Sequence, residues 1–133
     1  MSANLDFVRS IYADWECGDF SRSDWADPQI EYVIVGGPEP GESTGLAGMA
    51  KAWRNVLRTM DDYRSLLDEC REIDAERVLV LVHRSGHGKT SGLDVAQVGD
   101  RGAALFHIRN GRVTRLVIYL ERDQALADLD LEE

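Results

Sequence analysis

The chain has 133 residues, of which 44% are hydrophobic and 29% are charged, a composition typical of a globular domain. Its net charge of −9 at pH 7 makes nucleic acid and anionic membranes poor partners, because there is no excess of basic residues to neutralise phosphates. The apolar runs are too short to cross a bilayer. Since two cysteines make no disulfide framework and no signal peptide is recognisable, we expect one cytoplasmic domain spanning residues 1–133.

Two amphipathic helices are predicted in the first half of the chain. The first has apolar residues at three- and four-residue spacing and ends near Gly18: Leu5, Val8, Ile11, Tyr12 and Trp15. A short β-branched strand, Ile30–Val35, follows and leads into a polar loop that ends at Thr44. The second helix begins there, with Ser43 or Thr44 as its N-cap. Its apolar stripe is Leu46, Met49, Ala50, Trp53, Val56, Leu57 and Met60.

The second half of the chain reads as a series of strands. Tyr63–Ile73 and Arg77–Ser85 are long strand-like runs, and a glycine-rich link leads from them to a further strand at Leu93–Val98 with a bulge near Gly99–Gly102. Asn110-Gly111 then joins the strands Ala103–Ile108 and Val113–Leu120 in a tight hairpin, because both residues tolerate positive φ. A short helix begins near Arg122. This order predicts an α+β fold in which a curved antiparallel sheet wraps around the N-terminal helices.

Three segments carry a resemblance to a known family. They are Arg84–Leu93 (RSGHGKTSGL), Leu105–Val113 (LFHIRNGRV) and Tyr119–Leu126 (YLERDQAL). Together with the order of elements, they resemble the SnoaL-like branch of the NTF2-like superfamily over nearly the whole chain. The resemblance implies a cone-shaped α+β barrel with a pocket between the helices and the concave face of the sheet, often as a homodimer. It implies no single activity, since the superfamily includes isomerases, cyclases, dehydratases, hydrolases and proteins without catalysis.

The chain departs from the ketosteroid isomerases that it resembles. Those enzymes use a carboxylate base and a protonated aspartic acid, and the matching positions here are Val33 and Ala103. The position of their helical phenol is Ile11, with Tyr12 one residue away. Steroid-type isomerisation is therefore not expected.

The candidate site residues are aromatic, imidazole and apolar side chains. Tyr12, Trp15, Tyr32 and Trp53 could stack on a flat ligand, although aromatic residues at such spacing also form ordinary cores. On the strand before the last turn, Leu105 and His107 share a face with Ala103, and an imidazole there could act as a general base with Tyr12 as its acid–base partner. The remaining candidates for the ligand-binding walls are His83, Leu105 and Leu120. A half-buried structural histidine is the alternative for both His83 and His107.

Other patterns are weaker. His83 and His87 are four residues apart on a strand that runs into a glycine-rich turn, so no metal site is expected. No motif for binding phosphate or a nucleotide is recognisable, so no other cofactor is expected. Asp94 and Arg84 would form a surface ion pair across strands. Since the last strand is apolar on both faces, we expect one face to pack on the helices and the other on a second copy of the chain.

Two functional classes remain open from the sequence. The first is a non-catalytic protein that binds a small apolar or aromatic molecule. The alternative is a small isomerase, cyclase, dehydratase or hydrolase that acts on an apolar or polyketide-like metabolite through His107 and Tyr12. The absence of both isomerase carboxylates favours the first class slightly.

Overall fold

A computed structural model describes residues 3–17, 19, 24–36, 41–88 and 101–129. Its elements follow one another as α1 (Ala3–Glu16), β1 (Ala26–Val35), β2 (Gly41–Thr44), α2 (Gly45–Thr59), β3 (Met60–Glu72), β4 (Arg77–Gly88), β5 (Arg101–Arg109), β6 (Arg112–Tyr119) and α4 (Arg122–Asp128). The expected strand Leu93–Val98 lies outside the described residues, as do Asp94 and most of the expected bulge.

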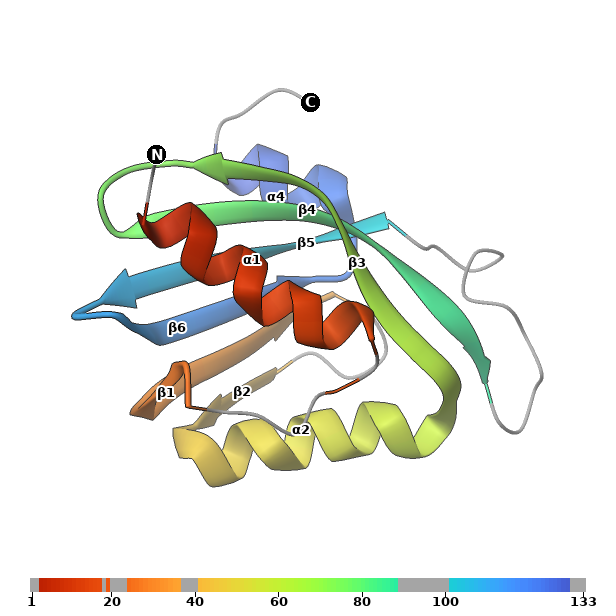
Figure 1. The fold of residues 1–133 in the computed structure, drawn as a ribbon. Helices are drawn as coiled ribbons and strands as arrows, with labels where there is room; N and C mark the ends of the chain where they lie inside the picture. The colour runs from red at the N-terminus through yellow and green to blue at the C-terminus, as the bar shows by residue number, and fades with distance from the viewer. Residues whose placement is uncertain (1–2, 18, 20–23, 37–40, 89–100, 130–133) are drawn as a thin grey trace.

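The strands form one six-stranded sheet in the order β2-β1-β6-β5-β4-β3. Figure 1 shows that the sheet is strongly curved, that α1 and α2 lie on its concave side, and that α4 lies on the opposite side. Hydrogen bonds near both ends of α1 hold it against the β3–β4 hairpin: Asn4 Nδ2 donates to the carbonyl oxygen of Ala75 at 2.9 Å, and the backbone N–H of Leu67 donates to Glu16 Oε2 at 3.2 Å. The predicted α+β fold is confirmed.

The sheet differs from the sequence-based expectation in four respects. The loop expected before Thr44 contains the short strand β2, which pairs with β1. The first strand begins at Ala26 and has a register shift between Ala26 and Glu31, where Pro28 interrupts the donors of the ladder. The pairing of β1 with β6 is parallel, so the sheet is mixed. At the C-terminal end of α2, Met60 is the first residue of β3 and does not extend the apolar stripe of the helix.

The hairpin between β5 and β6 agrees with the sequence pattern. Asn110 and Gly111 have φ angles of 54° and 75°, the left-handed conformation that a two-residue turn of this kind requires. Along both strands, side chains alternate between the two faces of the sheet. Ala104, Phe106 and Ile108 therefore point toward α1, and Ala103 and Leu105 point away from it.

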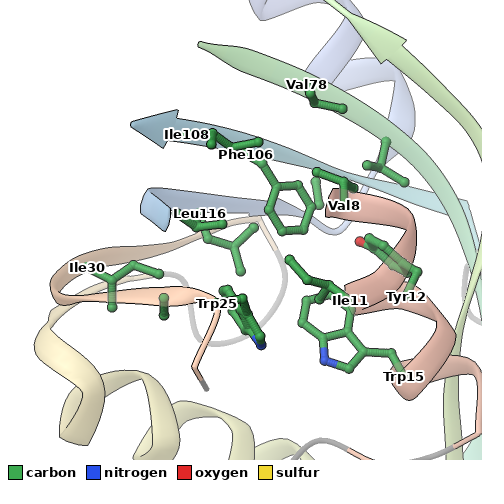
Figure 2. Packing of buried hydrophobic residues seen from close by; sticks show 14 of the residues in the cluster. Val8, Ile11, Tyr12, Trp15, Trp25, Ile30, Val78, Phe106, Ile108 and Leu116 are labelled. Carbon is green, nitrogen blue, oxygen red and sulfur yellow. The ribbon is translucent and has the colours of Figure 1, made fainter. Parts of the chain in front are cut away.

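Each face of the sheet carries its own hydrophobic cluster. The inner cluster fills the space between the concave face and the helices α1 and α2, and Figure 2 shows Ile11, Tyr12 and Trp15 of α1 pointing toward Phe106 and Trp25. The outer cluster lies on the convex face: Val33, Leu79, Leu81, Ala103, Leu105, Val117, Tyr119, Ala125 and Leu126. Most apolar side chains of the central strands are thus buried on one face or the other.

The outer cluster shows what covers the second apolar face of the last strand, the face from which a homodimer is expected. Ala125 and Leu126 of α4 pack on Val117 and Tyr119, so the second apolar face of the last strand is covered within the chain itself. The apolar pattern of this strand therefore does not require a second copy. Within the described ranges, no helix has both the length and the apolar character needed to cross a membrane.

Candidate functional site

Aromatic rings from α1, α2, β1 and β5 meet in the inner cluster. Tyr12 packs edge-on against Trp15 and Phe106, with ring centroids 4.7 and 5.9 Å apart. The ring centroids of Trp15 and Trp53 are 5.2 Å apart, and those of Tyr32 and Trp53 are 6.0 Å apart. All five rings are at most 9% exposed. The four aromatic residues predicted from the sequence as ligand-binding walls or core are thus brought together.

Polar groups lie within this apolar interior. A hydrogen bond links the side chains of Tyr12 and Ser65, and Ser65 is only 6% exposed. The Tyr63 hydroxyl interacts electrostatically with those of Tyr12 and Tyr32, so the three phenols lie close together. Arg84 in turn interacts electrostatically with Tyr63. We call Tyr12, Tyr32, Tyr63, Ser65 and Arg84 the polar cluster.

Burial strengthens the preference of the phenols of the polar cluster for their neutral form. Burial, followed by the neighbouring Tyr63, raises the pKa of the Tyr12 hydroxyl well above its ordinary value, although the hydrogen bond with Ser65 opposes the shift. Burial likewise raises the pKa of Tyr32. Burial raises the pKa of Tyr63 as well, with the charge of Arg84 acting in the opposite direction. At neutral pH these groups are therefore hydrogen-bond donors and not bases.

The cluster is built from four elements. Tyr12 lies on α1, Tyr32 on β1, Tyr63 and Ser65 on β3, and Arg84 on β4. Ser65 and Arg84 are directly opposite each other in the antiparallel pairing of β3 with β4. Tyr63 and Arg84 are partly exposed, whereas Tyr12, Tyr32 and Ser65 are buried. The cluster therefore extends from the surface into the core.

His107 does not join this cluster. It lies between Phe106 and Ile108, which both point inward, and it is opposite Arg77 on one side and Arg115 on the other. Partial burial, then the positive charges of Arg115 and Arg77, lower the pKa of His107. Tyr12 and His107 are on opposite faces of the sheet, so the acid–base pair expected from the sequence does not form in this arrangement. Their individual catalytic roles stay predictions.

His83 and Leu105 also lie on the convex face. His83 Nδ1 is 2.6 Å from Asp68 Oδ1, and Arg122 Nη2 donates to the other oxygen of that carboxylate at 2.8 Å. Arg122 also donates to the carbonyl oxygen of Val82 at 2.8 Å, so this group joins the start of α4 to the sheet. Leu105 belongs to the outer cluster. These positions separate both residues from the interior aromatic rings.

Leu120 lies where the sheet ends beside β1. Its N–H donates to the carbonyl oxygen of Val35 at 3.2 Å, and its own carbonyl oxygen accepts a hydrogen bond from Arg84.

The positions that match the isomerase carboxylates face outward. Val33 and Ala103 both belong to the outer cluster. Their neighbours Tyr32 and Ala104 point into the inner cluster, and neither is a carboxylate. Matching the isomerase carboxylates to these neighbouring positions instead would therefore not restore the isomerase pair.

A shallow groove of about 200 Å³ lies between α1 and the turn that joins β5 to β6. Its lining residues are Phe7, Ser10, Ile11, Asp14, Asp24, Trp25, Gly111 and Arg112. None of the site residues predicted from the sequence lines it, and it is smaller than typical small-molecule sites. Among the residues with described positions, no three histidine, cysteine, aspartate or glutamate side chains are grouped as metal ligands.

Three members of the polar cluster were missed from the sequence. The sequence pattern places Tyr63 and Ser65 in a strand without indicating a role for them, and it predicts a surface ion pair of Arg84 with Asp94. The alternation of β4 carried the signal, because Val78, Val80 and Val82 point inward and Arg84 continues their row. An arginine at the end of an inward-facing valine row is a candidate site residue.

Comparison with solved structures identifies the class of fold. An NTF2-like protein from Burkholderia thailandensis is 18% identical, with a TM-score of 0.77 over 99% of this chain and 100% of that chain. TerC, crystallised with polyporic acid, is 21% identical, with a TM-score of 0.74 over 96% and 98% of the two chains. A proposed polyketide cyclase from Sinorhizobium meliloti is 22% identical, with a TM-score of 0.64 over 85% and 93%. At these identities the similarity establishes an NTF2-like fold.

The family follows from the sequence match. The model of the SnoaL-like domain matches residues 8–116, which is most of the chain. The protein therefore belongs to the SnoaL-like domain family. No curated protein sequence matches the chain.

Proposed function

We propose that this protein binds a small aromatic molecule between α1, α2 and the concave face of the sheet. The observation that carries the proposal is the polar cluster, a set of phenol and hydroxyl groups placed next to Trp15 and Trp53 in an otherwise apolar interior. Ligand sites in proteins combine apolar walls with a few polar groups that fix orientation. The crystallisation of TerC with polyporic acid supports small-molecule binding as a property of this fold.

The arrangement favours binding over the acid–base alternative. Burial raises the pKa of the Tyr12 hydroxyl and so makes it a weaker acid, which suits it to donate a hydrogen bond to a ligand oxygen rather than to transfer a proton. His107, the residue predicted to act with it, faces the other side of the sheet. We therefore propose Tyr12 and Tyr32 as ligand-contacting residues and leave His107, His83 and Leu105 outside the site.

Calorimetric titration with 2-naphthol tests the proposal, because this probe combines a flat apolar ring system with one hydroxyl. We expect saturable binding, and Tyr32→Phe should weaken it about three- to tenfold, since the variant keeps the ring but loses one hydrogen-bonding group. His107→Ala is the matched control and should leave the affinity unchanged. No saturable binding, or equal losses in both variants, would contradict the proposal.

The homodimer and the cytoplasmic location stay predictions from the sequence. A monomer has a mass of 14.9 kDa, so a dimer would scatter light as a particle of about twice that mass. Because α4 already covers the outer cluster, a dimer would have to use other surfaces. Light scattering on the purified protein measures this mass and so distinguishes a monomer from a dimer.

A further inference from the structure

We propose that the convex face of the sheet carries a site for a phosphate group, formed by Arg77, His107 and Arg115. These three residues lie next to one another on neighbouring strands, on the side of the sheet opposite to the interior aromatic rings. We call them the basic row. The inference goes beyond the proposed function and does not rest on it, because the two sites lie on different faces of the sheet.

The pairing of three strands fixes the basic row. His107 on β5 is directly opposite Arg77 on β4 and directly opposite Arg115 on β6. Residues that are opposite each other in this way have Cβ atoms about 5 Å apart, so both guanidinium groups can reach the imidazole. Leu79 and Val117, two residues further along β4 and β6, belong to the outer cluster. Arg77 and Arg115 therefore point to the convex face, as His107 does.

The basic row is accessible to an ion from solvent. The side chains of Arg77 and Arg115 are 36% and 39% exposed, and His107 is half-buried between them. In the described part of the chain, Arg77 Nε donates to Asp74 at 2.8 Å, and Arg115 Nη1 donates to Glu31 at 2.6 Å. These bonds use one side-chain donor of each arginine. Since a guanidinium carries five N–H donors, both arginines retain donors for a further acceptor.

Positive charge prevails at the imidazole of His107. The charged groups that act on it come from the neighbouring strands and from the turn before β4: Arg115, Arg77, Asp74 and Glu31. Partial burial, and then the two arginines, lower the pKa of His107 although the two carboxylates oppose this shift. On α4, Asp128 is hydrogen-bonded to Tyr119, four residues beyond Arg115 on β6. A bound anion would offset the repulsion between a protonated His107 and the arginines, so anion binding and protonation favour each other.

The number of donors indicates the shape of the anion. A phosphate group attached through one oxygen has three further oxygens that accept hydrogen bonds, whereas a carboxylate has two. Three side chains in a row can therefore each bond a separate oxygen of a phosphate group. Guanidinium groups also pair closely with phosphate, and a protonated imidazole adds a further charge-assisted hydrogen bond.

Nuclear magnetic resonance of the histidine rings in the full chain tests the proposal. Sulfate is the probe, because it is tetrahedral like phosphate but does not titrate near neutral pH, and sodium chloride keeps the ionic strength constant. We expect a saturable shift of the His107 signals and a constant signal for His83, which is paired with Asp68. Sulfate should bind at least about threefold more tightly at pH 5.5 than at pH 8, because protonated His107 adds a charge-assisted hydrogen bond.

Three variants locate the bound anion. Arg77→Met and Arg115→Met should each weaken sulfate binding about three- to tenfold, since each removes a guanidinium from the row. Arg101→Met is the matched control, because Arg101 is an exposed arginine of β5 opposite His83, away from His107. This variant should leave the affinity unchanged.

Several results would overturn the proposal. They are the absence of a saturable shift at His107, an affinity that does not rise at low pH, and equal losses in Arg101→Met and the two row variants. Acetate that binds as tightly as sulfate would overturn the preference for a phosphate group. Should one row variant not fold, the other and the wild-type pH comparison still decide. None of these results bears on 2-naphthol binding at the concave side.

Discussion

Gly102→Ala should destabilise the protein through contact with a neighbouring strand. The added Cβ would lie 2.7 Å from the carbonyl oxygen of Tyr119, a backbone atom that cannot rotate away. Relief requires β5 and β6 to move apart at a buried position, and overpacking of this kind costs about 1–3 kcal/mol. Because the φ angle of Gly102 is outside the positive range, steric contact rather than backbone strain causes the loss.

The cost converts into a melting temperature. At about 2.1 cal/mol/K per residue, the unfolding entropy of 133 residues is about 0.28 kcal/mol/K. A loss of about 1–3 kcal/mol therefore lowers Tm by about 4–11 °C. Thermal unfolding followed by circular dichroism measures this shift.

Gly41→Ala is the matched control for this experiment. Gly41 is also a strand glycine, but its added Cβ would meet no atom within 4 Å. Its stability should change by no more than about 0.5 kcal/mol. If Gly102→Ala melts within about 1 °C of the wild-type protein, the close approach of β5 and β6 at this point is wrong.

Two further predictions concern the convex-face ion pair and the inner core. Although burial acts to raise it, hydrogen bonds from Arg122 and His83 lower the pKa of Asp68. Its stabilisation is therefore present above the unfolded value of about 3.9 and is lost as pH falls below it. After allowance for solvent screening, Asp68→Asn should cost about 0.5–1 kcal/mol in urea unfolding at pH 7. This cost should shrink as the pH falls from the unfolded pKa through the lowered pKa of the folded protein, and a cost that does not change with pH would refute the assignment. Phe106 is fully buried, so Phe106→Ala should cost about 3–5 kcal/mol in the same assay. Phe7 is partly exposed, so Phe7→Ala should cost less than half of that. Similar costs for the two variants would contradict the packing.

Local patterns were sufficient to predict the helices and the hairpin. The spacing of apolar residues located α1, and the Asn110-Gly111 pair located the turn between β5 and β6, because both signals depend on a few neighbouring residues. The position of β2 could not be read in this way. Its four residues, Gly41–Thr44, are polar and form a strand only because β1 offers an edge with which to pair.

The site was harder to predict than the fold. Alternation correctly placed His107 on the face of Ala103 and Leu105, but the sequence does not show which face of a strand the helices cover. Which face the helices cover depends on contacts between α1 and β3, and the residues in these contacts are distant in sequence. Arg84 could not be predicted as a site residue for the same reason. Its inward direction follows only once Val80 and Val82 are known to face α1.

The four tyrosines offer the most direct test of the interior site. Tyr12, Tyr32 and Tyr63 belong to the polar cluster, whereas Tyr119 lies in the outer cluster and serves as an internal control. With carbon-13 labels on tyrosine rings, nuclear magnetic resonance during a 2-naphthol titration should show saturable shifts for the first three and a constant signal for Tyr119. Shifts at Tyr119 alone, or equal shifts at all four rings, would contradict a ligand site on the concave side of the sheet.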